Sequence, residues 1–131
     1  PEVLFIMAGV NDYRANILGS ESVENLAALR EKCERNGIKA VFLTPTPLNP
    51  AQIQQVKFID PPPEDWQEHQ RFICDWIRGQ ENFIDVNEKL TDDEGNLIYL
   101  LSVDGLHPDA EGKRIIGEAV AAWLDKYLNL Q

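Results

Sequence analysis

The chain has 131 residues, of which 44% are hydrophobic and 26% are charged, a composition that fits one domain with a packed core. Its formal net charge is −10, with 12 basic residues among 22 acidic ones. Binding to nucleic acid or to an anionic membrane surface requires clustered basic side chains, so we expect neither. No apolar run reaches the roughly 18 residues of a membrane-spanning helix. A neutral ester or amide substrate is compatible with this charge.

The two cysteines, Cys33 and Cys74, have no metal-ligand spacing and lie in helical patterns with apolar neighbours. This setting favours buried, reduced thiols over a disulfide, and it predicts a cytoplasmic protein. Because the chain begins at Pro1 rather than at a methionine, a secreted protein that has lost its leader stays an open alternative. We expect no metal and no organic cofactor.

Apolar patterning predicts an alternation of strands and helices. We predict strands at Val3–Ala8, Ile38–Leu43 and Phe83–Val86, and helices at about Ser22–Asn36, Pro63–Arg78 and Asp109–Leu128. Ser20 or Ser22 is expected to cap the first helix, and residues 45–63 are expected to form a long proline-rich loop that serves as a pocket wall. The alternation predicts an α/β fold with a parallel sheet, whose sites lie at the carboxyl ends of the strands.

The most apolar strand, Val3–Ala8, stands at the N-terminus of the chain. An exposed apolar edge strand would promote aggregation, so we expect another strand to pair with it. That strand would come from an upstream segment of the same protein or from a second copy. We favour the upstream segment, and therefore treat residues 1–131 as a single domain truncated at its N-terminus.

The segment Asp104-Gly105-Leu106-His107-Pro108 contains the first candidate catalytic pair. An imidazole accepts a proton from a hydroxyl nucleophile only when a carboxylate on its other nitrogen fixes its orientation. Asp104 and His107 are three residues apart in a predicted loop, and Gly105 lets that loop turn them toward each other. The alternative is a chance occurrence of Asp-x-x-His, and the position of the pair, after the last predicted strand and directly before the last predicted helix, favours the catalytic interpretation.

The segment Gly9-Val10-Asn11-Asp12 directly follows the first predicted strand. The side-chain amide of Asn11 could donate to a developing oxyanion there, a role that contributes roughly 3–4 kcal/mol to transition-state binding. The alternative is that Asn11 and Asp12 only cap the turn. Tyr13 and Arg14 follow, and they are weak candidates for substrate contacts beside the alternative of a solvated loop.

Taken together, the two segments resemble the third and fifth sequence blocks of the GDSL/SGNH hydrolases, and the continuation "HPDAEGKRIIGEAV" is similar to that family's C-terminal helix. The resemblance implies a three-layer, flavodoxin-like parallel sheet, of which this chain would supply the third to fifth strands. It also implies an oxyanion donor at Asn11 and a catalytic pair at Asp104 and His107. The family name covers lipases, esterases and acylhydrolases, which need no cofactor.

One departure from the family pattern concerns the nucleophile. The family carries it in a Gly-Asp-Ser block after the first strand, and this chain has no such block. Of the local serines, Ser20 and Ser22 are expected to act as helix caps, and Ser102 is too close in sequence to His107 to serve as its nucleophile. The second histidine, His69, is expected to be structural. The nucleophilic serine is therefore predicted to lie upstream, as is a glycine that donates to the oxyanion.

These observations predict a serine-dependent hydrolase of carboxylic esters, active as the full-length protein and inactive as these residues alone. Its substrate would be a small-molecule, lipid or sugar ester. The alternative is a binding or interaction module that keeps the hydrolase scaffold without the nucleophile. The sequence before Pro1 would distinguish the two.

Overall fold

The computed structural model describes residues 1–130, which form two compact units. The first unit comprises Pro1–Pro45 and Pro61–Asp85, and the second comprises Thr46–Asp60 and the chain from Val86 onward. The prediction of a single domain is not tested by this division.

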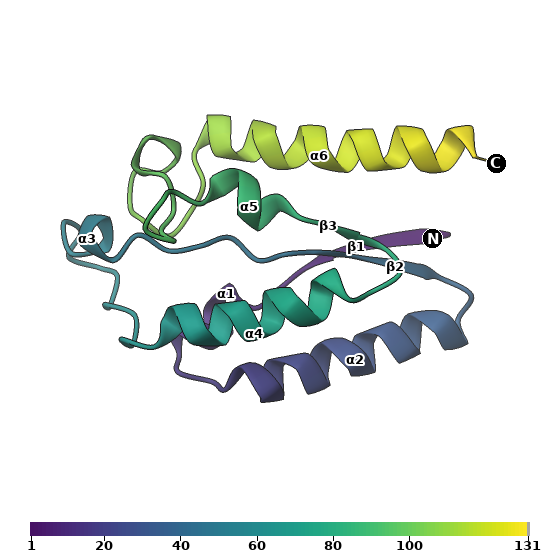
Figure 1. Ribbon diagram of the computed structural model, residues 1–131, viewed down its shortest axis with the longest axis horizontal. Coiled ribbons are helices and arrows are strands. Elements are labelled where there is room, and N and C mark those ends of the chain that lie inside the picture. Colours follow the sequence, from purple (N-terminus) through teal and green to yellow (C-terminus); the bar gives the residue numbers. More distant parts are fainter. Residues whose placement is uncertain (131) are drawn as a thin grey trace. The chain divides into compact units, whose positions relative to one another are not determined.

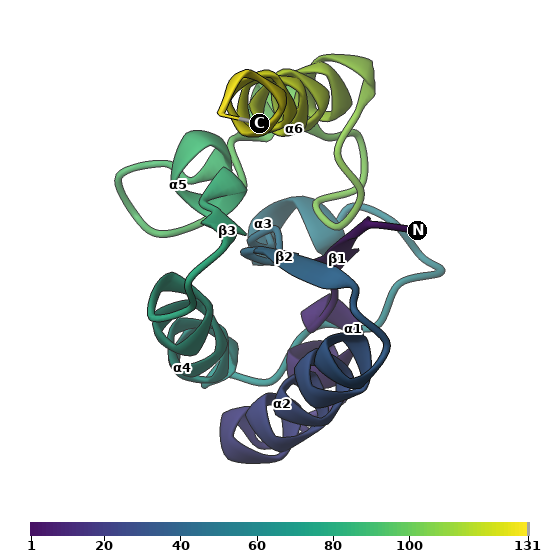
Figure 2. The ribbon, with the colours of Figure 1, turned by 90° about the vertical axis from the view of Figure 1, so that its right-hand side faces the viewer.

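The first unit contains a sheet of three parallel strands in the order β1-β2-β3. These strands are β1 (Val3–Met7), β2 (Lys39–Leu43) and β3 (Phe83–Ile84), connected by α1 (Val10–Arg14), α2 (Gly19–Arg35) and α4 (Trp66–Arg78). Helices α2 and α4 pack against each other and cover the same face of the sheet (Figures 1 and 2). Their buried apolar residues and those of β2 form the core of this unit.

The register of the parallel strands places the carboxyl ends of all three at the same end of the sheet. Leu43 pairs with Met7 on one side and with Ile84 on the other. The residue after β3, Asp85, accepts hydrogen bonds from Thr44 Oγ1 at 2.9 Å and from Arg78 Nε at 2.8 Å. Strand β3 ends at Ile84, two residues earlier than the apolar pattern predicts, and this polar cluster follows it directly.

The second unit contains α3 (Pro50–Ile53), α5 (Val86–Leu90), the 3-10 helix η1 (Tyr99–Leu101) and α6 (Ala110–Asn129). Leu90, Leu97 and Leu101 form its buried centre, against which Ile115 and Ile116 of α6 pack. The predicted apolar face of the last helix is half-buried along its length, which agrees with its expected 3.6-residue period. None of the helices among residues 1–130 has the length and apolar character needed to cross a membrane.

The three strands and the three long helices were predicted, but several details differ. Neither Ser20 nor Ser22 caps α2, whose N-cap is Leu18, and Ser22 instead donates to Asp12 Oδ2 at 2.8 Å. Helix α4 begins at Trp66 rather than at Pro63, because residues 64 and 65 form a turn before it. Short helices also occupy three stretches expected to be loop or strand, namely Val10–Arg14, Pro50–Ile53 and Val86–Leu90.

Candidate active site

The second unit brings Asp104 and His107 into direct contact, as the sequence predicts. His107 Nδ1 lies 2.6 Å from Asp104 Oδ2, and the backbone N–H groups of Leu106 and His107 both donate to Asp104 Oδ1 at 2.8 Å. One carboxylate therefore closes the turn and holds the imidazole. Because a carboxylate accepts, we assign the proton of the neutral ring to Nδ1, which leaves Nε2 as a base.

The electrostatics of this turn keep Asp104 ionised. Burial acts to raise the pKa of Asp104, but the hydrogen bonds from the His107 ring and from the N–H groups of His107 and Leu106 outweigh it. Together they lower the pKa of Asp104 from 3.8 to about 2. The His107 side chain is 70% exposed, whereas that of Asp104 is 13% exposed. A partly buried carboxylate thus orients an exposed imidazole, an arrangement that suits general-base chemistry.

The Ser102 hydroxyl forms hydrogen bonds with two backbone groups of the loop that contains Asp104 and His107. It donates to the His107 carbonyl at 2.7 Å and accepts from the Gly105 N–H at 3.0 Å. The residue is only 5% exposed. Its hydroxyl is therefore used to shape the loop, which agrees with the expectation that Ser102 is not the nucleophile.

Gly105 is required by both the turn and its surroundings. Its φ of +80° lies in the left-handed region, and a Cβ atom there would lie 2.5 Å from the Asn49 carbonyl oxygen and 2.8 Å from the Ile53 nitrogen. The Asn49 N–H donates to the Gly105 carbonyl at 2.8 Å. The catalytic loop is thus seated directly on the backbone of α3.

The start of α6 anchors the other end of the loop. Asp109 is the N-cap of α6, and its side chain accepts from the Gly112 N–H at 2.9 Å. The Asp109 N–H donates to the Leu101 carbonyl at 2.7 Å, and Ser102 and Pro108 form an isolated antiparallel bridge. Residues 102–108 are consequently closed into a short loop between η1 and α6.

The predicted oxyanion donor, Asn11, lies in the first unit, just past the carboxyl end of β1. The chain turns at Gly9, whose carbonyl accepts from the N–H groups of Asp12 and Tyr13, and Asn11 occupies the first turn of α1. The Asn11 side chain is exposed, and its Oδ1 accepts from Arg14 Nη1 at 3.3 Å. Since Oδ1 is engaged, the Nδ2 group is the part of the amide that remains to donate to a substrate oxygen.

The two weaker candidates beside Asn11 differ in their surroundings. Tyr13 is fully buried, its ring lies 6.1 Å from that of Trp66, and burial raises its pKa well above the usual value. Tyr13 therefore packs in the core under the turn, and its predicted substrate contact stays a prediction. Arg14 donates a hydrogen bond to the Asn11 side chain, and this contact can orient the Asn11 amide.

His69 is a buried residue of α4, as expected for a structural histidine. Its Nδ1 accepts from the Gly19 N–H at 3.3 Å, and its Nε2 lies 3.1 Å from the Asp65 carboxylate. This contact ties the start of α2 to α4. Among residues 1–130, no group of three or more His, Cys, Asp or Glu side chains is placed to hold a metal ion.

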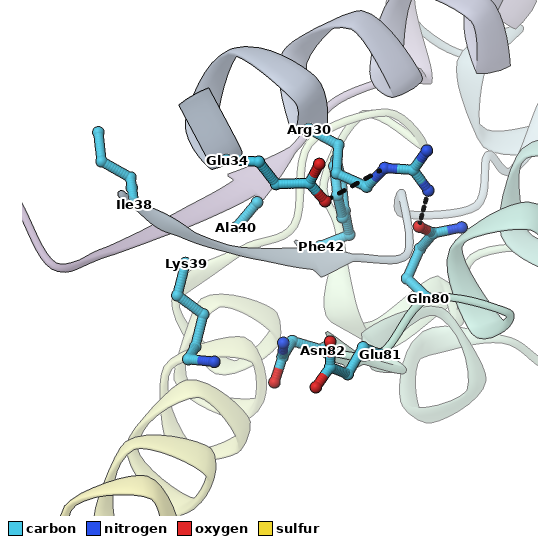
Figure 3. Close-up of a pocket in the computed structure, with 9 residues that line it drawn as sticks. All are labelled: Arg30, Glu34, Ile38, Lys39, Ala40, Phe42, Gln80, Glu81 and Asn82. Carbon is cyan, nitrogen blue, oxygen red and sulfur yellow. Dashed lines mark hydrogen bonds and ion pairs between the residues drawn. The ribbon is translucent and has the colours of Figure 1, made fainter. Parts of the chain in front are cut away.

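A cavity of about 160 Å³ lies at the opposite end of the sheet, where Lys39 begins β2 and Asn82 precedes β3 (Figure 3). Its central cation, Arg30, donates to Gln80 Oε1 at 2.8 Å, lies 3.7 Å from Glu34 and covers the Trp76 ring. These contacts with the protein satisfy the guanidinium, so the cavity has the character of a structural polar cluster rather than of a catalytic site.

Sequence reasoning missed two polar residues that contact the catalytic loop from α3. Asn49 is 7% exposed and Gln52 is 3% exposed. Asn49 Oδ1 caps α3 by accepting from the Gln52 N–H at 3.1 Å, and Asn49 Nδ2 donates to the Leu97 carbonyl at 2.9 Å. The sequence did hold a signal for this helix, because Asn followed by Pro is a typical helix start.

Comparisons with known proteins place these observations in context. The model of the GDSL-like lipase/acylhydrolase family matches residues 1–115. No curated protein matches the chain.

Among solved structures, the chain is similar to a GDSL-like lipase from Bacteroides thetaiotaomicron (22% identity, TM-score 0.77, covering 97% of this chain and 63% of that one). It is also similar to a protein provisionally described as an acylhydrolase from Bacteroides fragilis (20% identity, TM-score 0.76, covering 98% and 63%). A third is a protein provisionally described as a platelet activating factor from Streptococcus pneumonia (23% identity, TM-score 0.74, covering 94% and 59%).

At these identities the likeness shows a shared fold, and it confirms the predicted parallel α/β class. The chain spans about three fifths of the length of these relatives, 59% to 63%.

Proposed function

Because the chain belongs to the GDSL-like lipase/acylhydrolase family, we propose that the full-length protein hydrolyses carboxylic esters by a serine mechanism. The observation that carries this proposal is the contact between His107 Nδ1 and Asp104 Oδ2 at 2.6 Å. This contact gives His107 a fixed orientation and an ionised partner, which are the two properties that the general base of a serine hydrolase needs.

In the proposed reaction, a serine from a segment upstream of Pro1 attacks the ester carbonyl. His107 Nε2 takes the hydroxyl proton, and Asp104 stabilises the imidazolium that forms. His107 then gives this proton to the leaving alcohol, and an acyl-enzyme remains. A water molecule attacks the acyl-enzyme in the same way, which releases the acid and restores the serine.

The oxyanion that forms at each attack needs donors. We assign the Asn11 side chain as one of them, since its Oδ1 is occupied by Arg14 and its Nδ2 group is available. Removing one such donor costs about 10²–10³-fold in kcat in serine hydrolases. The acidic surface, with a net charge of −10, favours a neutral ester over an anionic one.

Labelling of the full-length protein with a fluorophosphonate, followed by peptide mapping, tests the proposal. We expect one adduct on a serine upstream of Pro1, no adduct on Ser102, and loss of labelling in His107→Ala. We also expect hydrolysis of p-nitrophenyl acetate to fall by at least 10³-fold in that variant. Lys113→Ala is a suitable control, since Lys113 is exposed on α6 and its side chain has no part in the loop.

Two results would contradict the proposal. Full activity of His107→Ala on p-nitrophenyl acetate would remove His107 from the chemistry. The absence of any adduct on the native protein would instead favour a binding module that keeps the hydrolase fold, with Asp104 and His107 as a remnant.

A further inference from the structure

The side chain of Gln52 reaches from α3 to the backbone of the catalytic loop. Its Nε2 donates to the Ser102 carbonyl at 2.6 Å and to the Tyr99 carbonyl at 3.4 Å. These carbonyls belong to the first residue of η1 and to the residue that ends it. The glutamine is therefore a bridge across η1, just before the chain enters the Asp104–His107 turn.

The orientation of this amide is fixed by its partners. Both partners of Nε2 are carbonyl oxygens, which only accept, so the amide cannot be rotated to present its own oxygen to them. As a consequence, Gln52 Oε1 is buried and has no hydrogen-bond partner within residues 1–130. A buried acceptor without a partner lowers stability, so this position is poorly explained as a contribution to folding alone.

The bridge acts on a residue that shapes the catalytic turn. The Ser102 carbonyl is held by Gln52, while the Ser102 hydroxyl binds the His107 carbonyl and the Gly105 N–H. Asn49 supports the same loop, because its N–H binds the Gly105 carbonyl. Two neighbouring residues of one short segment thus hold the loop by its main chain on both sides of Asp104.

We propose that Gln52 is a positioning residue, which holds the Ser102–His107 loop so that Asp104 and His107 keep their hydrogen bond. This inference rests on the proposed esterase function for its kinetic consequence, but its structural part stands apart from activity. A misplacement of about 1 Å in a catalytic group can lower the rate about 10²-fold. We therefore expect the loss of the Gln52 hydrogen bonds to lower kcat.

The test uses the full-length protein and the variant Gln52→Met, which keeps the length of the side chain but removes the donor. The matched control is Gln54→Met, because Gln54 is exposed and ends the same short helix. Ile116→Ala is a second control, which weakens the core of the same unit without removing a hydrogen bond of the loop. All kinetics are measured well below the melting temperature of each variant.

Two measurements report on the loop. In p-nitrophenyl acetate hydrolysis, we expect Gln52→Met to lower kcat about 10–100-fold and to leave KM within about twofold. In proton NMR spectra, the downfield signal of the His107 Nδ1 proton, identified by its absence in His107→Ala, should weaken or disappear in Gln52→Met. Both controls should keep the wild-type kcat and the wild-type signal.

Gln52→Glu covers the case in which Gln52→Met does not fold. Its protonated carboxyl can donate one of the two bonds, so we expect kcat and the NMR signal to lie between those of the wild type and of Gln52→Met at mildly acidic pH. If the folded Gln52→Met protein keeps a kcat within threefold of the wild type together with the NMR signal, Gln52 is not a positioning residue. The same conclusion follows if Gln52→Met does not fold and Gln52→Glu equals the wild type in both measurements. If wild type and His107→Ala are equally active, the proposed function fails, and the NMR signal alone decides the role of Gln52.

Discussion

Replacement of Gly105 by alanine tests the seating of the catalytic loop on α3. At φ +80°, an alanine costs about 1–2 kcal/mol relative to glycine. The new Cβ would also lie 2.5 Å and 2.8 Å from two backbone atoms of α3, which cannot rotate away as a side chain would. Overpacking of this kind costs typically ~1–3 kcal/mol. We therefore expect Gly105→Ala to lower the free energy of unfolding by about 2–5 kcal/mol.

Two other glycines separate these contributions. Gly37 has φ +66° but open space around an added Cβ, so Gly37→Ala should lower the free energy of unfolding by only about 1–2 kcal/mol. Gly117 lies within α6, also in open space, and Gly117→Ala should raise it by about 0.5–1 kcal/mol. Urea denaturation followed by circular dichroism measures all three in the full-length protein. If Gly105→Ala is no less stable than Gly37→Ala, the described contact with α3 is wrong.

Four further predictions rest on the same structure. Asp104→Asn removes the charge that stabilises the His107 imidazolium, so kcat should fall roughly 100-fold or more in steady-state assays with p-nitrophenyl acetate. Because the pKa of Asp104 is lowered from 3.8 to about 2, its contribution to stability is present above pH 3.8 and is lost toward pH 2, so urea midpoints measured across that window should fall less in Asp104→Asn. Burial raises the pKa of the Cys74 thiol to about 12, and Cys74 should resist Ellman's reagent at pH 8 until urea unfolds the protein. Leu90→Ala, at a site with no exposure, should lower the free energy of unfolding by about 2–5 kcal/mol, and an unchanged urea midpoint would contradict the described core.

The sequence was sufficient to predict the strands, the long helices and the Asp104–His107 contact. A repeat of apolar residues that continues over many positions predicts a long helix or a buried strand. Two side chains three residues apart in a turn are close enough to contact each other whatever the rest of the fold. The same reasoning extended β3 too far and missed α5, because Val86 continues the apolar run of β3 although it begins α5 in the structure. Short helices have little periodicity to detect.

The candidate site was predictable only in its local part. Asp104 and His107 are found by spacing, whereas Gln52 contacts Ser102 across 50 residues of sequence. A hydrogen bond from a side chain to a distant backbone carbonyl leaves no trace in the sequence of the carbonyl residue, because every residue has that group. The burial of Tyr13 was missed for a related reason: its place under the turn depends on Trp66 of α4.

The way in which α3 holds the Ser102–His107 loop has a consequence for which positions around the loop can be substituted. Gln52 binds the loop through main-chain carbonyls, so the side chains at Tyr99, Leu100 and Val103 take no part in that support, and they are 54%, 82% and 81% exposed. These three positions precede the Asp104–His107 turn in sequence and can be substituted while the hydrogen bonds of the loop persist. Selection or engineering could therefore alter the exposed apolar side chains that precede the turn independently of the geometry of the Asp104–His107 pair.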